Sequence, residues 1–243
     1  MSAKVLMLAS GKGGTGKSTV SVLLGAKLAA RGHRVLLVEL DSGLRSVDVI
    51  SGVYGKTVYD VEDILSGRCR ADKAVAESPL YPNLAVISAP YSGGTVQTAP
   101  LAAFLQQVHD AFDFILLDTA AGMGSPFEAA AAVAHLALLV ITPDPVTLRD
   151  GRIVSDALYE HPCLTVRLLL NKVPQTLAGT GIEDLDVCID TVGAQLIGVL
   201  PDSEQVKIAG ATGTKLPQDC KADRAFAAVA ARICGQEIPL VIA

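Results

Sequence analysis

The chain has no tryptophan, and aromatic residues make up only 4% of its 243 residues. Proteins that bind single-stranded nucleic acid stack the bases on aromatic side chains, so this scarcity argues against that function. Basic residues are not in excess either, because the formal net charge is −5. A general nucleic-acid coat needs a basic face, so the charge argues against DNA binding, although it leaves room for a small basic patch formed across a dimer.

Paired cysteines and long apolar segments are also missing. The five cysteines are scattered without a CxxC motif, which is typical of reduced cytosolic thiols and predicts neither a disulfide framework nor a zinc site. The apolar segment most similar to a membrane span, residues 129–143, has no formal charge but is shorter than the about 20 residues that a span needs. No signal peptide precedes the first strand-like run. We therefore expect a soluble, cytoplasmic protein.

Apolar residues make up 50% of the sequence and gather in short runs that end in small or acidic residues. The runs are near-continuously apolar, which is typical of parallel strands covered on both faces. Segments 17–31, 145–160 and 221–234 have helical spacing or helix-end signals. We predict an α/β fold, a doubly wound and mostly parallel sheet of about seven or eight strands flanked by helices, in one domain spanning residues 1–243. The predicted strands are 5–9, 35–40, 84–89, 114–118, 136–142, 164–173 and 196–200.

A glycine-rich segment lies between the first apolar run and the first predicted helix. It matches the pattern G-x-x-x-x-G-K-[ST], which in that setting is the phosphate-binding loop of P-loop proteins. Its glycines let backbone N–H groups approach phosphate oxygens, Lys17 reaches the β- and γ-phosphates, and the Ser18 hydroxyl binds Mg²⁺. We expect the nucleotide to contact Gly11, Lys12, Gly13, Gly14, Thr15, Gly16, Lys17, Ser18 and Thr19.

Asp118 is the last residue of the apolar run that begins at Phe114. A carboxylate at the carboxyl end of a buried parallel strand faces the ligand crevice of an open α/β sheet. There it can hold the Mg²⁺ shell through water, and with the loop it predicts phosphoryl chemistry on a nucleoside triphosphate. The alternative interpretation is an aspartate that caps the turn after the strand.

The general motif does not require Lys12, and residues 12–19, Lys-Gly-Gly-Thr-Gly-Lys-Ser-Thr, resemble the deviant loop of the MinD/ParA family of ATPases. Residues 38–48, residues 58–60 with Gly67, residues 142–150 and residues 201–213 resemble further segments of that family, and of its MinD branch in particular. The resemblance extends from residue 3 to about residue 235.

This resemblance implies roles for residues outside the general motif. Lys12 is expected to reach the phosphates of a partner subunit across an ATP-sandwich homodimer. Asp41 is expected to position the attacking water, with a possible place in the Mg²⁺ shell through water. Asn171 is expected to bind the adenine edge, and Pro201 with Asp202 to close over the base. The pair formed by Asn171 and the lysine after it is also found in proteins that bind guanine, but no aspartate follows two residues later, which favours ATP and ADP.

The chain departs from the family pattern at Glu39, in residues 119–122, which lack the usual proline, and after Arg232. Neither of the first two departures removes a hydrolytic group. Glu39 stands where the family usually has aspartate, so its reach into the metal shell can differ. The residues after Arg232 include no lysine or arginine, so we do not expect the basic amphipathic helix with which the MinD branch binds membranes. Membrane association is then expected to be peripheral and to depend on a partner.

The function implied by the resemblance is an ATP-hydrolysing switch whose state is detected by an effector or activating protein, as in MinD-like regulators of division-site or other positioning. A ParA-type ATPase that segregates DNA or positions cargo is an alternative, but it needs basic surface. A metal-centre or metabolic carrier ATPase is another, but such proteins typically add paired cysteines. Intact Lys17, Ser18, Asp41 and Asp118 argue against a nucleotide-binding module without turnover.

Overall fold

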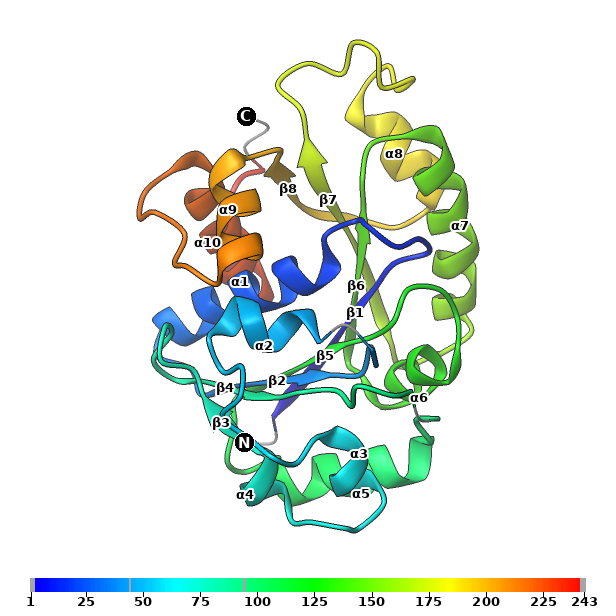
Figure 1. Ribbon diagram of the computed structural model, residues 1–243. Helices are drawn as coiled ribbons and strands as arrows, with labels where there is room; N and C mark the ends of the chain where they lie inside the picture. Colours follow the sequence, from blue (N-terminus) through cyan, green and yellow to red (C-terminus); the bar gives the residue numbers. More distant parts are fainter. Residues whose placement is uncertain (1–2, 44, 94, 241–243) are drawn as a thin grey trace.

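The computed structural model describes residues 3–43, 45–93 and 95–240 (Figure 1). Within these ranges one sheet of eight strands runs through the molecule in the order β3-β4-β2-β5-β1-β6-β7-β8, and all neighbours are parallel except β3 and β4. The strands are β1 Lys4–Ala9, β2 Val35–Glu39, β3 Ala76–Glu77, β4 Leu84–Ile87, β5 Phe114–Asp118, β6 Leu136–Ile141, β7 Thr165–Val173 and β8 Leu196–Pro201.

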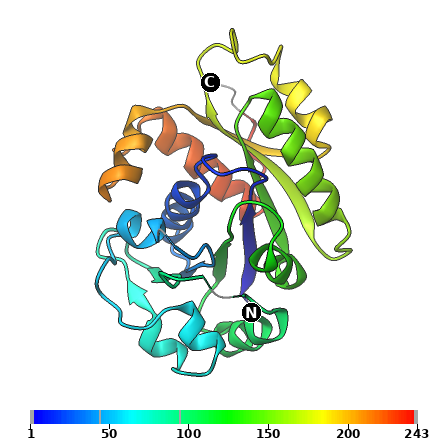
Figure 2. The same ribbon diagram turned by 45° about the vertical axis from the view of Figure 1, so that its right-hand side comes forward.

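Helices cover both faces of this sheet. The helices are α1 Lys17–Ala30, α2 Ser46–Ser51, α3 Val61–Leu65, α4 Ala71–Ala74, α5 Thr98–Val108, α6 Ser125–Val133, α7 Pro145–Tyr159, α8 Leu185–Val192, α9 Glu204–Thr212 and α10 Lys221–Ile233. One core cluster joins the sheet to α5, α6, α7 and α8, and a second joins it to α1, α2 and α10. Figure 2 shows the sheet between the blue α1 and red α10 on one side and the green α7 and yellow α8 on the other.

The central strands are buried along their whole length, because a crossover helix lies over each face of a parallel sheet. This is why their sequences are continuously apolar instead of alternating. The predicted doubly wound, mostly parallel sheet is confirmed, and each predicted apolar run forms a strand. None of the helices within the described ranges is long and apolar enough to cross a membrane.

The strand order places a crevice at the carboxyl end of β1. From β1 the chain first builds one half of the sheet, through β2, β4 and β5, and later crosses to the other half, which begins with β6. In open α/β sheets the loops diverge at such a reversal and leave a site for ligands above the strand ends. The glycine-rich loop and Asp118 both lie at this edge.

Candidate nucleotide-binding site

The glycine-rich loop joins β1 to α1 and surrounds a cavity of about 280 Å³. Gly14 and Gly16 have φ values of 84° and 87°, in the left-handed region that glycine adopts without strain. Gly16 is the N-cap of α1 and no side chain caps it, so the partial positive charge at the start of the helix is available to an anion. The cavity is lined by Ser10, Lys12, Gly13, Gly14, Thr15, Gly16, Lys17, Ser18, Thr19, Asp41, Ser46, Ile50, Ala121 and Gly210.

Two glycines of the loop pack against distant parts of the chain. A Cβ atom on Gly11 would lie 2.8 Å from the carbonyl oxygen of Asp150 in α7. A Cβ atom on Gly16 would lie 2.6 Å from Nδ2 of Asn171 in β7. Gly11 is therefore required by packing against α7, and it does not line the cavity.

The loop lysine and the strand-end aspartate are in direct contact at the floor of the site. Lys17 Nζ lies 3.0 Å from Asp118 Oδ1, and the two side chains are only 6% and 0% exposed. The hydroxyl of Ser21, one helical turn after Lys17, donates to the same oxygen at 2.8 Å. The other oxygen of Asp118, Oδ2, is buried and has no hydrogen-bond partner among the described residues.

Asp41 follows β2 and contributes its side chain to the cavity wall. Burial raises the pKa of its carboxyl group above the ordinary value, and the positive charge of Lys17 acts in the opposite direction. The negative charge of Asp118 raises the pKa of Asp41 further. The structure thus brings together Lys17, Asp41 and Asp118, three of the residues predicted to carry the chemistry.

Glu39 is the last residue of β2 and lies beside Asp118 in the strand register. Its Oε1 accepts from the backbone N–H of Val47 in α2 at 3.1 Å, and its Oε2 accepts from that of Ala89 at 3.2 Å. Burial raises the pKa of Glu39 to about 7. Through these two bonds the Glu39 carboxylate fixes α2 to the end of the sheet, a role that the sequence pattern did not indicate.

The residues expected to bind the base lie beside the loop. Asn171 is buried and its Nδ2 donates to the carbonyl of Thr15 at 2.7 Å. Lys172, whose φ is 54°, donates from Nζ to the carbonyl of Gly14 at 2.7 Å. The strand end therefore supports the loop directly, and base recognition by Asn171 stays a prediction.

Pro201 and Asp202 lie at the end of β8, next to this support. The backbone N–H of Asp202 donates to the carbonyl of Val173 at 2.8 Å. The Asp202 carboxylate pairs with Lys207 of α9 at 2.9 Å. These contacts tie the end of β8 to β7 and α9, and closure over a base by this segment stays a prediction.

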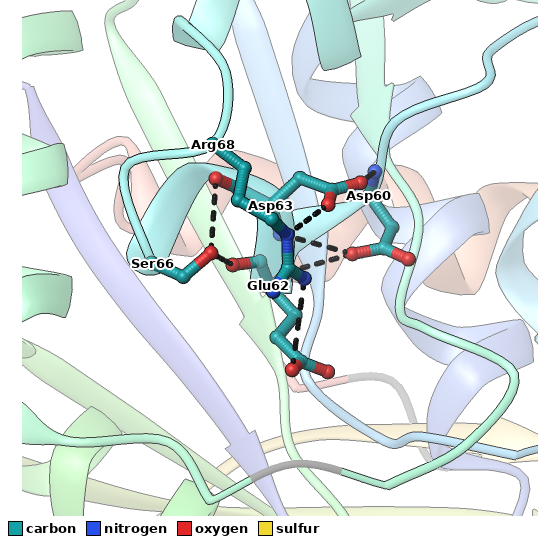
Figure 3. Close-up of polar contacts among 5 residues, drawn as sticks. All are labelled: Asp60, Glu62, Asp63, Ser66 and Arg68. Atoms are coloured by element: carbon teal, nitrogen blue, oxygen red, sulfur yellow. Dashed lines mark hydrogen bonds and ion pairs between the residues drawn. The ribbon is translucent and has the colours of Figure 1, made fainter.

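The family-like segment Val58–Asp60 lies outside the cavity and starts α3. Figure 3 shows Asp60 and Asp63 in a capping box: Asp60 Oδ1 accepts from the backbone N–H of Asp63 at 3.2 Å, and Asp63 Oδ2 accepts from that of Asp60 at 3.1 Å. Asp60 Oδ1 also accepts from the backbone N–H of Glu62 at 2.9 Å. Arg68 Nε donates to Asp63 Oδ1 at 2.7 Å. These bonds satisfy the first N–H groups of the helix, so the segment has a structural role here.

The donor set of the cavity fits a magnesium nucleotide. Mg²⁺ prefers oxygen ligands, and in nucleotide sites it takes one or two from the protein and the rest from phosphates and water. The Ser18 hydroxyl and the unpartnered Oδ2 of Asp118 are such oxygens. Among the described residues, no group of three or more His, Cys, Asp or Glu side chains could hold a metal ion.

Comparison with known proteins agrees with this geometry. The sequence pattern of the CobQ/CobB/MinD/ParA nucleotide binding domain matches residues 6–216. The chain therefore belongs to this family of P-loop nucleotide-binding domains.

Individual relatives narrow the assignment. The septum site-determining protein MinD of Synechocystis is 32% identical over 244 residues, covering 98% of this chain and 92% of that protein. MinD in the MinC:MinD cell division complex of Aquifex aeolicus is 27% identical with a TM-score of 0.90 and 98% of each chain covered. MinD of Pyrococcus horikoshii, solved with Mg-ADP, shares the fold at 23% identity, with a TM-score of 0.82 and 95% and 96% covered. The chain is a MinD-like member of an ATPase family.

Proposed function

We propose that this protein is an ATP-hydrolysing switch that forms an ATP-bound homodimer and signals its state to an effector protein, as a MinD-like regulator of position in the cell. The observation that carries the proposal is the cavity lined by a glycine-rich loop, Lys17 and Asp41, in which Lys17 is paired with the buried Asp118. Mg·ATP is the proposed ligand, with the triphosphate along the loop and Ser18 and Asp118 on the metal side. When bound, Mg²⁺ supplies neutralisation of the phosphate charge.

The side chains of the cavity then have separate tasks. Lys17 binds phosphate oxygens as a fixed positive charge in a water-poor site, where such a contact is strongest. Asp41 orients the attacking water in line with the γ-phosphate. Thr15, Gly16 and the start of α1 provide backbone N–H groups that do not need to reorganise during the reaction.

Lys12 is the residue proposed to couple nucleotide binding to dimerisation. Its side chain is exposed at the mouth of the cavity, so it is free to reach beyond its own subunit. A cation that enters a partner's site favours the dimer only while phosphates are present there, which gives a switch. The solved complex of a MinD relative with MinC supports an effector protein as the partner that detects the dimer.

The test is turnover of ATP by the purified chain with Mg²⁺, with oligomeric state followed on a sizing column. ATP should be hydrolysed and should bind more tightly than GTP by roughly 5- to 150-fold, because losing one base contact pair costs about 1–3 kcal/mol. Lys12→Ala should keep ATP binding but lose ATP-dependent dimerisation. If GTP competes with ATP equally well, the assignment of Asn171 to adenine is wrong. If Lys12→Ala still dimerises normally with ATP, the role of Lys12 across the dimer is wrong. Stimulation of turnover by DNA would favour a ParA-type function instead.

A further inference from the structure

Ser21 lies at the floor of the site but outside the phosphate motif. It is fully buried in α1, one turn after Lys17. Its hydroxyl is 2.8 Å from Asp118 Oδ1 and 3.0 Å from the carbonyl oxygen of Lys17. A hydroxyl has a single proton, and a carboxylate is the stronger acceptor, so the proton is directed at Asp118.

The two oxygens of Asp118 are in different situations. Oδ1 accepts from both Lys17 and Ser21, whereas Oδ2 is buried without a partner. An unpartnered buried carboxylate oxygen is costly, so it is expected where a ligand or its hydration shell completes it. The donors on Oδ1 determine which oxygen is left for that shell, because they fix the rotation of the carboxylate.

We propose that Ser21 is a positioning residue that holds Asp118 with Oδ2 available to the Mg²⁺ shell. The inference rests on the proposed function. In the nucleotide-bound protein Lys17 is required at the phosphates, so Ser21 becomes the donor that keeps Oδ1 in place. Ser21 can do this because it is attached to a helix that is itself packed in the core.

The experiment measures ADP affinity by calorimetry over a range of free Mg²⁺ concentrations, for the parent and for Ser21→Ala. Loss of a residue that orients a metal ligand typically weakens metal affinity by about 10- to 100-fold. Ser21→Ala should therefore need about 10- to 100-fold more Mg²⁺ for the same gain in ADP affinity. Its ADP affinity in EDTA should match the parent, because the loop, Lys17 and the start of α1 are unchanged.

Two further variants make the result specific. Ser21→Thr keeps a hydroxyl at the same place and should restore the Mg²⁺ dependence. Ser155→Ala makes the same change at another buried helix serine, in α7, whose hydroxyl has no partner among the described residues, and should behave like the parent. Thermal unfolding checks that each variant is folded.

The outcomes separate this inference from the proposed function. A parent that binds no ADP, or binds it without any effect of Mg²⁺, overturns both. If the parent behaves as expected and Ser21→Ala needs the same Mg²⁺ concentration as the parent for its gain in ADP affinity, the role of Ser21 alone is overturned. The role of Ser21 is also contradicted if Ser21→Ala loses the same ADP affinity in EDTA as in Mg²⁺, or if a folded Ser21→Thr behaves like Ser21→Ala. In either case the serine would stabilise the helix and would not orient Asp118 toward the metal.

Discussion

Strand β5 has an aspartate at each end, and the two carboxylates are in opposite situations. Asp113, just before the strand, pairs with Arg34 at 2.8 Å, and the side chains are 38% and 54% exposed. Asp118, its last residue, pairs with Lys17 at 3.0 Å in almost complete burial. Water screens the first pair, so it adds little to stability, whereas burying the second pair costs free energy that their attraction only partly offsets.

The difference shows that burial, and not distance, separates a functional ion pair from an ordinary one on this sheet. The amino end of β5 carries charges that are already satisfied by solvent and by each other. The carboxyl end keeps a lysine, an aspartate with an unpartnered oxygen, and a glutamate with a raised pKa within one small region. Such a concentration of buried charged groups is typical of a functional site.

The largest effect is expected at Asp41, on the wall of the cavity. Asp41→Ala should lower ATP turnover by about 10²–10⁴-fold, because water-positioning groups typically contribute about that much. ATP binding should persist, so the variant should accumulate as an ATP-bound dimer on a sizing column. Ser42→Ala is the matched control, because Ser42 lines a different cavity and not the one that Asp41 lines. If Asp41→Ala hydrolyses ATP at the parent rate, another group orients the attacking water. If it cannot bind ATP, Asp41 has a structural or metal-binding role instead.

The next effect is on stability and has opposite signs at the two ends of the sheet. The pKa of Glu39 rises from 4.5 to about 7, so the folded chain holds a proton that the unfolded chain has lost. The stability from Glu39 is complete below pH 4.5 and is lost as the pH rises through about 7, a change of roughly 3 kcal/mol. Arg34 holds the pKa of Asp113 below 3.8, so that stability is present above pH 3.8 and is lost as the pH falls.

Urea unfolding at a series of pH values measures both effects. The unfolding free energy of the parent should decrease relative to Glu39→Gln between pH 4.5 and 7, and the two profiles should run parallel above pH 8. Glu39→Gln should also lose one backbone hydrogen bond at every pH, which shifts its profile without bending it. Asp113→Asn should differ in shape from the parent only in acid, below about pH 4. Parallel profiles for parent and Glu39→Gln between pH 4.5 and 7 would contradict the raised pKa.

The smallest of the three effects compares the two cations. Lys17→Ala should weaken ATP binding by roughly 10- to 150-fold, since a hydrogen bond to a charged group contributes about 1.5–3 kcal/mol. Arg34→Ala removes the exposed cation from the other end of the sheet and should leave ATP affinity unchanged. Calorimetric titration with ATP and Mg²⁺ measures both variants. Equal losses would show that the ends of the sheet are not independent.

The sequence predicted the parts of this protein that are local along the chain. Each buried strand is an uninterrupted apolar run, and the phosphate loop, Lys17 and Asp118 are recognisable from type and spacing alone. Strand β3 was missed because it has only two residues, too few to show a pattern of apolar and polar positions. The contact of Ser21 with Asp118 and that of Glu39 with Ala89 were missed because they depend on packing between segments far apart in sequence. No spacing rule reports such contacts.

The close approach of Gly11 to α7 and of Gly16 to β7 has a consequence for how the loop can change in evolution. Neither position accepts a side chain without moving a backbone or the Asn171 amide, whatever the loop binds. A descendant protein that no longer bound a nucleotide would still be selected to keep both glycines. Gly13 would be free to vary, because a Cβ atom built on it has no neighbouring atom within 4 Å. The presence of Gly11 and Gly16 in a relative thus indicates common ancestry and fold. Whether that relative hydrolyses ATP has to be judged from the residues at Lys17, Asp41 and Asp118.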